Sequence, residues 1–183
     1  MRFMEELRDF NALTYRLQYL IRYSNVPRIK DESVASHSFF VATIVLFLHE
    51  WYKFDLSDAL GMAICHDLPE ARVNDICHET KKAYPRLNEM INEFEVQVAE
   101  KELPKAAKEY FLQYMNDHKS PEAKIVKFAD AIQCYQYSCN EVLMGNRGYM
   151  EQVQTNSRAR IEEMLLELQP FITDKWGEDD SNI

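Results

Sequence analysis

Glycine and proline are scarce in this sequence, with 4 glycines and 6 prolines among 183 residues. A fold that depends on many tight turns, such as a β-sandwich, uses more of both, because these residues supply the backbone angles that turns require. No segment shows a convincing strand alternation of apolar and polar residues. Hydrophobic residues nevertheless make up 46% of the chain and aromatic residues 12%. A substantial core is therefore expected, and disorder is not.

Positive charge and long apolar runs are also in short supply. The chain has 21 basic and 30 acidic residues, a net charge of −9, which argues against a nucleic acid polymer as partner. The longest apolar run, residues 39–48, is too short to cross a membrane, and the charged start lacks the apolar region of a signal peptide. The four cysteines form no CxxC pair, as is typical of reduced proteins. We therefore expect a cytoplasmic protein without a membrane partner.

Apolar residues recur at steps of three and four along most of the chain, which predicts an all-α fold. A third helix is expected to begin at an N-cap, Ser57, and to carry His66, Asp67 and Glu70, with a kink or end at Pro69. Residues 71–82 are expected to form a loop with a short turn. The other predicted helices cover residues 4–23, 34–51, 86–102, a segment from 104 onward, 121–144 and 149–169. One domain over residues 1–175 would then precede an acidic mobile tail at 176–183.

The string from Ile64 to Glu70 places a histidine and an aspartate side by side at the inner end of an apolar helix. A buried, unpaired carboxylate is costly, and a divalent cation would remove that cost. Glu70 follows His66 by four residues and Asp67 by three, so on a helix it lies on the same side as both. A carboxylate there can stay off the metal and handle the proton of a metal-bound water.

Two further residues of ligand type interrupt apolar segments. His37 opens the apolar second helix, and Asp130 lies within the apolar part of the long helix that begins at Pro121. Each alone is more often a helix cap or a hydrogen-bonded core residue. Together with His66 and Asp67, they give three helices that each present a metal-ligand type.

This ordered set, His37, then His66-Asp67, then Asp130, resembles the HD-domain metal-dependent phosphohydrolases. The local context is similar to the small 5′-deoxynucleotidase-like branch, in the segments LIRY at 20–23, ESVASHS at 32–38, HDLPEAR at 66–72 and KFADA at 127–131. The resemblance extends from about residue 13 to about residue 145. It implies an HD-domain helical bundle with a metal site between the central helices.

The resemblance also implies the chemical roles of individual residues. One divalent transition metal (Mn, Co, Fe, Ni or Zn) would be bound by His37, His66, Asp67 and Asp130. The catalytic acidic residue would be Glu70, with Asp75 as a second acidic residue near the reacting phosphate and sugar. The substrate-binding residues would be Arg22, Tyr23 beside the nucleoside, where relatives often carry tryptophan, and Lys81 at the phosphate.

Several activities agree with this pattern. The first is a 5′-nucleotidase that releases phosphate from (deoxy)nucleoside 5′-monophosphates. A deoxynucleoside triphosphate triphosphohydrolase needs more cations along the phosphate chain, for which Arg28, Lys30 and Lys82 are candidates. Phosphodiester cleavage and a non-catalytic nucleotide-binding protein are further alternatives. A homo-oligomer, such as a dimer, is expected from the family, and the remaining histidines, His49, His78 and His118, are not expected to bind the metal.

Overall fold

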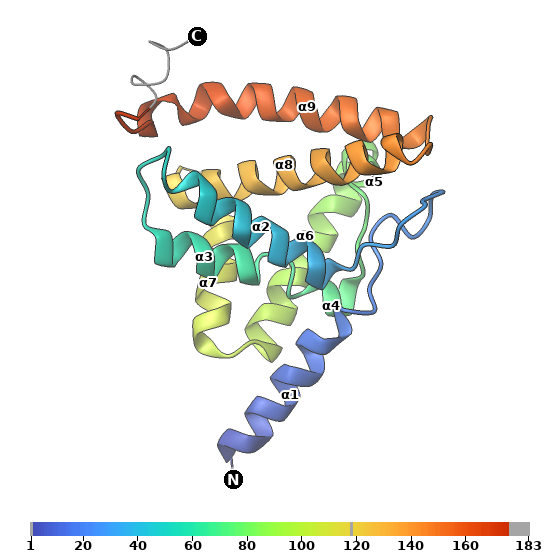
Figure 1. Cartoon of the computed structure of the whole chain (residues 1–183). Coiled ribbons are helices and arrows are strands. Elements are labelled where there is room, and N and C mark those ends of the chain that lie inside the picture. Colours follow the sequence, from blue (N-terminus) through green and yellow to red (C-terminus); the bar gives the residue numbers. More distant parts are fainter. Residues whose placement is uncertain (1, 118, 176–183) are drawn as a thin grey trace.

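The computed structural model describes residues 2–117 and 119–175 as a helical bundle (Figure 1). The predicted tail at 176–183 and His118 lie outside the described residues. The helices are α1 (Arg2–Arg16), α2 (Val34–Leu48), α3 (Leu56–Cys65), α4 (Glu70–Val73), α5 (His78–Ala83), α6 (Pro85–Glu102), α7 (Lys105–Asn116), α8 (Pro121–Leu143) and α9 (Tyr149–Leu168), followed by the 3₁₀ turn η1 (Gln169–Phe171). Among the described residues the only β-type pairings are two isolated bridges, so the predicted all-α class is confirmed. None of these helices has the length and apolar character needed to cross a membrane.

Helix α8 lies at the centre of the bundle, with α9 along one side and α2 and α3 on the other (Figure 1). The main hydrophobic core fills the space between α8 and the α2–α3 layer. Many of its side chains are small or branched and permit close helix packing, namely Val41, Val45, Ala63, Ile125, Val126 and Ala129, and the larger Met62 and Phe128 lie among them. This packing fixes the helices that present the predicted metal ligands.

A second hydrophobic cluster joins the end of α1 to α6 and α7. It contains Leu13 and Leu17 from the α1 region, Leu68 from the turn after α3, and Phe111 from α7. The beginning of α1 projects away from the bundle (Figure 1), and residues 2–9 are exposed. The cluster anchors the turn at 66–69, which carries two of the predicted ligands.

Helix α1 is shorter than predicted, because it ends at Arg16 rather than near residue 23. The backbone that follows pairs with the start of α2: Leu17 O accepts from Ala35 N at 3.2 Å and Leu20 O from Val34 N at 2.9 Å. These contacts replace helical hydrogen bonds while the apolar side chains still face the core. The helical periodicity therefore continues beyond the helix itself.

Two further helix boundaries differ from the prediction. The N-cap of α3 is Asp55, whose side chain accepts from Asp58 N at 3.0 Å, and not Ser57. The expected loop at 71–82 contains the short helices α4 and α5, and Glu70 begins α4 instead of continuing α3. The predicted stop after α8 is present, and Gly145 and Gly148 there adopt φ of +100° and +84°, angles that favour glycine.

Candidate metal centre and substrate cavity

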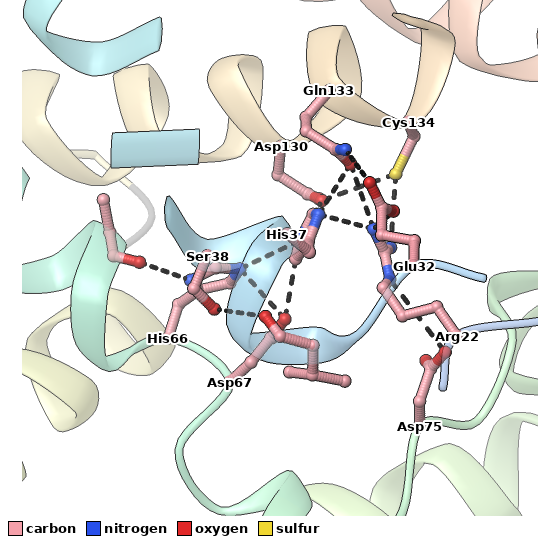
Figure 2. A network of polar contacts seen from close by, with 12 residues as sticks. Arg22, Glu32, His37, Ser38, His66, Asp67, Asp75, Asp130, Gln133 and Cys134 are labelled. Atoms are coloured by element: carbon pink, nitrogen blue, oxygen red, sulfur yellow. Dashed lines mark hydrogen bonds and ion pairs between the residues drawn. The ribbon is translucent and has the colours of Figure 1, made fainter. Parts of the chain in front are cut away.

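Two imidazoles and one carboxylate converge where α2 meets the end of α3 (Figure 2). His66 Nε2 lies 3.1 Å from Asp67 Oδ2 and 3.4 Å from His37 Nε2, and His37 Nε2 lies 3.5 Å from the same carboxylate oxygen. One ligand atom from each residue falls within 4.8 Å of the others. His37 is placed by the Ser33 cap, one turn earlier on α2, and His66 directly follows α3.

Asp130 approaches the same imidazole from α8. Its Oδ1 lies 3.4 Å from His37 Nε2, while its Oδ2 pairs with Arg160 Nη1 of α9 at 3.2 Å. Helix α8 therefore adds a second carboxylate to the group, from a segment far away in the sequence.

An acceptor oxygen lies beside the opposite nitrogen of each ring and favours the tautomer that metal binding requires. At His37 the guanidinium of Arg22, which can only donate, also contacts this nitrogen. His66 Nδ1 donates to the carbonyl oxygen of Ala63 at 2.8 Å. His37 Nδ1 lies 2.6 Å from Gln133 Oε1, and Gln133 Nε2 donates to Glu32 Oε1 at 2.6 Å. When Nδ1 carries the proton in both rings, both Nε2 atoms are free to bind a cation. Two imidazoles with two carboxylates form a donor set that suits divalent transition metals, so these residues fit such an ion.

The two candidate carboxylate ligands remain ionised despite their burial. Burial opposes ionisation of Asp67, but His66, His37 and Arg22 together outweigh it and lower the pKa of Asp67 to about 2. Burial likewise opposes ionisation of Asp130, while His37 and Arg160 hold its pKa well below the usual range. Both side chains are thus available as anionic ligands at neutral pH.

Glu70 has the opposite electrostatic character. It is buried, and among the described residues its Oε2 has no hydrogen-bond partner. Burial first, and then the charges of Asp67 and Asp75, raise the pKa of Glu70 well above its ordinary value. A buried carboxyl group with an unused oxygen and a raised pKa is suited to accept or return a proton.

A cavity of about 650 Å³ opens beside these groups. Its walls come from the 22–23 segment, the 66–67 turn, α2, α4, α5, α6, α7, α8 and α9. The structure brings all the site residues predicted from the sequence to this cavity, namely Arg22, Tyr23, His37, His66, Asp67, Glu70, Asp75, Lys81 and Asp130. Its volume is in the range of small-molecule sites.

Arg22 is held by several protein groups at once. Its Nη1 lies 3.3 Å from Glu32 Oε2 and donates to Gln133 Oε1 at 3.1 Å, and it also contacts His37 Nδ1. Its Nη2 donates to Cys134 Sγ at 3.4 Å. The guanidinium is therefore part of the network that supports His37 (Figure 2).

Tyr23 and Asp75 meet beside Arg22. Tyr23 N donates to Asp75 Oδ2 at 3.3 Å, and Arg22 Nε lies 4.0 Å from the same oxygen. Tyr23 and Asn74, the residue before Asp75, both have positive φ, at 54° and 71°. Such backbone angles are costly for residues other than glycine and are often retained at functional sites. The Tyr23 ring stacks on Tyr137 with centroids 5.5 Å apart.

Lys81 of α5 also lines the cavity. Its Nζ is 3.8 Å from Glu95 Oε1 of α6, and both side chains line the cavity. Glu95 is buried, and burial raises its pKa in spite of the nearby lysine. Among the described residues, Glu95 is the one ion-pair partner of this lysine.

A model of the 5′-deoxynucleotidase YfbR-like family matches residues 9–175. The chain belongs to this family. Among solved structures, a conserved hypothetical protein of Pyrococcus furiosus is similar at 27% identity, with 87% of this chain and 94% of that chain covered and a TM-score of 0.70. No curated protein matches the chain.

Two structures of lower sequence identity show the fold alone. An HD-domain phosphohydrolase of Listeria innocua has 19% identity and a TM-score of 0.74, with 88% of this chain and 82% of that chain covered. The HD phosphohydrolase DatZ of cyanophage S-2L, solved with dA and one catalytic Zn²⁺ ion, has 19% identity and a TM-score of 0.66, with 86% and 84% covered. The HD-domain helical bundle predicted from the sequence is confirmed. As a member of the YfbR-like family, the chain is a metal-dependent nucleotide phosphohydrolase.

Several residues of this YfbR-like site were not predicted from the sequence. Gln133 follows Asp130 by three residues on α8, so its helical position could have indicated a shared face. Glu95 and Arg160 gave no comparable signal, because each reads as an ordinary surface charge, and Glu32 begins the family-like segment 32–38 but was given no role. His49 packs edge-on against Phe54 and is not among the cavity residues, as expected. Nothing is described for the side chain of His78.

Proposed function

We propose that this chain is a 5′-nucleotidase that releases phosphate from deoxynucleoside 5′-monophosphates. The observation that carries the proposal is the convergence of two imidazole Nε2 atoms and a carboxylate at one wall of a cavity of nucleotide size. Beside them lies Glu70 Oε2, a buried oxygen that has no hydrogen-bond partner within the described part of the chain. In this proposal His37, His66, Asp67 and Asp130 bind one divalent transition metal. The name of the YfbR-like family supports the substrate class.

The bound ion would polarise the phosphate and lower the pKa of water at the site. We expect Mn²⁺, Co²⁺, Fe²⁺, Ni²⁺ or Zn²⁺ rather than Ca²⁺, because imidazole ligands are unusual for calcium. The Zn²⁺ ion of the cyanophage relative supports a transition metal. Elemental analysis should find about one ion per wild-type chain and a large loss in Asp67→Ala. Equal metal content in the two proteins would contradict the ligand assignment.

The protein side chains would then handle the proton and the substrate. Glu70 takes a proton from the attacking water through its unpartnered oxygen. Lys81 contributes positive charge for the phosphate. Arg22, which is also hydrogen-bonded to other protein side chains, contacts the substrate from the cavity wall. Tyr23 and Asp75, which are joined by a hydrogen bond, lie beside the nucleoside.

The position of the basic residues supports a monophosphate rather than a triphosphate. Of the three extra cations that a triphosphate could use, only Lys82 lines the cavity. Arg28 instead pairs with Asp31 at 2.6 Å. Lys30 lies in the loop that Glu141 binds through backbone amides. Of these three predicted candidates, only Lys82 could therefore meet the phosphate chain of a triphosphate.

A product screen tests this choice. Nucleoside mono-, di- and triphosphates are incubated with the protein in Mn²⁺, Co²⁺, Mg²⁺ or Zn²⁺, and free phosphate is distinguished from triphosphate. We expect free phosphate from deoxynucleoside monophosphates. Release of intact triphosphate from deoxynucleoside triphosphates would replace the proposed activity with the triphosphohydrolase alternative.

We also propose that the protein forms a homo-oligomer, through the outer face of α2. Phe39, Phe40, Leu46 and Phe47 on this helix are 48–63% exposed. A cluster of large exposed apolar side chains of this kind is typical of an interface. Light scattering at several concentrations tests this, and a monomer at micromolar concentration would contradict it.

The four cysteines are all free, which supports the cytoplasmic location proposed from the sequence.

A further inference from the structure

Arg160 of α9 lies on the cavity wall beside the candidate metal centre. Its Nη1 is 3.2 Å from Asp130 Oδ2, and Asp130 Oδ1 is 3.4 Å from His37 Nε2. Two short contacts thus connect the guanidinium to the group of candidate ligands. No role for Arg160 follows from the sequence pattern, because α9 carries no residue of the HD signature.

Arg160 differs from Arg22 in the use of its hydrogen-bond donors. Arg22 is only 11% exposed and is shared among Glu32, Gln133 and Cys134. Arg160 is 37% exposed, and within residues 2–117 and 119–175 its one ion-pair partner is Asp130, bound through a single nitrogen. A guanidinium has five N–H donors in a planar fork. Most of those of Arg160 are therefore available to an anion in the cavity.

We propose that Arg160 binds a non-bridging oxygen of the substrate phosphate and is thus a substrate-binding residue of this enzyme. This inference rests on the proposed function, since it assigns a further contact to the same phosphate. The guanidinium and Lys81 approach from different elements, α9 and α5. Planar guanidinium groups bind phosphate in a bidentate manner and orient it, whereas an ammonium group acts as a point charge.

A purely supporting role is the main competing explanation. In that case Arg160 only fixes the orientation of Asp130, and its loss would weaken metal binding without a separate effect on phosphate. Binding of inorganic phosphate to the metal-loaded protein separates the two roles, since it needs no turnover. The nucleoside without its phosphate serves as the second probe.

The experiment compares Arg160→Gln with Arg158→Gln. Arg158 is a matched control on the same helix, because it also pairs with one carboxylate, that of Glu162 at 3.0 Å, but is not a cavity residue. Calorimetry on the Mn²⁺-loaded proteins measures the Kd of inorganic phosphate and of deoxyadenosine, and elemental analysis measures metal content. We expect Arg160→Gln to raise the phosphate Kd by about tenfold or more. Metal content, the deoxyadenosine Kd and all values for Arg158→Gln should stay unchanged.

Two results would overturn the inference. An unchanged phosphate Kd in Arg160→Gln means that the guanidinium does not contact the phosphate. Loss of metal in parallel with loss of phosphate binding assigns Arg160 to the support of Asp130 instead. Should Arg160→Gln not fold, Arg160→Lys retains the charge and should weaken phosphate binding several-fold, because it lacks the planar fork. An unchanged phosphate Kd in Arg160→Lys would then overturn the inference. Failure of the wild type to hydrolyse any nucleotide, with phosphate binding intact, would count against the proposed function alone.

Discussion

The two nitrogens of the His37 ring face different environments. Nδ1 faces a packed side, formed by Arg22, Glu32 and Gln133, in which each side chain bonds to another member. Nε2 faces a cavity side, formed by Glu70, Lys81 and Arg160, which line the cavity. On the cavity side, Lys81 and Arg160 have one ion-pair partner each among the described residues, and Glu70 has an oxygen with none.

This difference suggests that one set of residues positions the metal centre and the other takes part in the reaction. A buried polar network with all its groups paired is rigid, because any movement leaves a donor or acceptor without a partner. Unpaired groups beside a cavity are costly to the fold, and a ligand can satisfy them. Mutations on the packed side should therefore act first through stability and metal affinity, and mutations on the cavity side through substrate affinity and rate. Arg22 also lines the cavity, so its loss should weaken substrate binding as well.

The largest expected effect is on the cavity side, at Glu70. Glu70→Gln retains shape and hydrogen-bonding reach but removes the basic carboxylate, so kcat should fall by about 10²–10⁴-fold. Metal content and nucleotide binding should remain, which would make this variant suitable for trapping intact substrate. If Glu70→Gln kept near wild-type turnover, Asp75 would become the better candidate for the proton-handling residue. Loss of metal would instead identify Glu70 as a ligand.

On the packed side, Arg22→Ala should reduce the stability of the metal-free protein. The substitution leaves Glu32 buried without its cation, and breaking a buried pair from one side costs about 3–5 kcal/mol. Urea denaturation with a chelator present measures the free energy of unfolding. Arg8→Ala is the control, because Arg8 and its partner Asp9 are 74% and 71% exposed, and such pairs contribute less than about 1 kcal/mol. Equal, small changes in both variants would contradict the difference between the two sides.

Gln133→Leu tests whether the packed side controls the metal centre. The substitution removes the acceptor at 2.6 Å from His37 Nδ1, so the preferred tautomer is lost and metal affinity should fall by about 10–100-fold. Competition with a coloured chelator measures this affinity. Gln136→Leu provides the control on the same helix, since Gln136 is exposed. An unchanged affinity in Gln133→Leu would mean that the hydrogen bond does not set the tautomer.

The metal-ligand pair His66-Asp67 and, on the cavity side, Glu70 could be predicted from the sequence, because they lie in one short motif, whereas Arg160 could not. His66, Asp67 and Glu70 fall within five consecutive positions, so local geometry alone brings them together. That geometry was nevertheless wrong in detail, because Glu70 begins a new helix after a turn instead of continuing α3. Its NH group still bonds to Asp67 O at 3.1 Å, which preserves the proximity expected from a helix.

The packed side could not be predicted in the same way, because it joins residues that are far apart. Glu32 and Gln133 are 101 positions apart and meet only through the packing of α8 against the start of α2. Arg22 is positioned by the pairing of segments 20–22 and 32–35, where the sequence predicted that the first helix continued to residue 23. Helical periodicity identifies which residues face the core, but it does not identify the polar partner of each.

The smallest expected effect lies at the edge of the packed side, at Glu141 of α8. This carboxylate accepts from Ile29 N and Lys30 N, both at 2.7 Å, and from Asn146 Nδ2 at 2.6 Å. It thereby fixes the loop that leads to Glu32. Burial opposes ionisation, but these hydrogen bonds prevail and lower the pKa of Glu141. Because its pKa is lower in the folded state than in the unfolded state, ionised Glu141 stabilises the fold above the ordinary glutamate pKa of about 4.3.

That stabilisation should be lost as the pH falls through the lowered pKa of the folded state. Glu141→Gln should therefore be less stable than the wild type by about 1–3 kcal/mol at pH 7, and the difference should shrink toward pH 3. Thermal melts of metal-free protein across this pH range measure the difference in stability, with the exposed surface variant Glu162→Gln as control.

Glu70 has a raised pKa, so its ionised form costs stability, and Glu70→Gln should gain stability relative to the wild type as the pH rises. Parallel pH profiles for Glu141→Gln and Glu70→Gln would show that the two carboxyl groups are not in opposite environments.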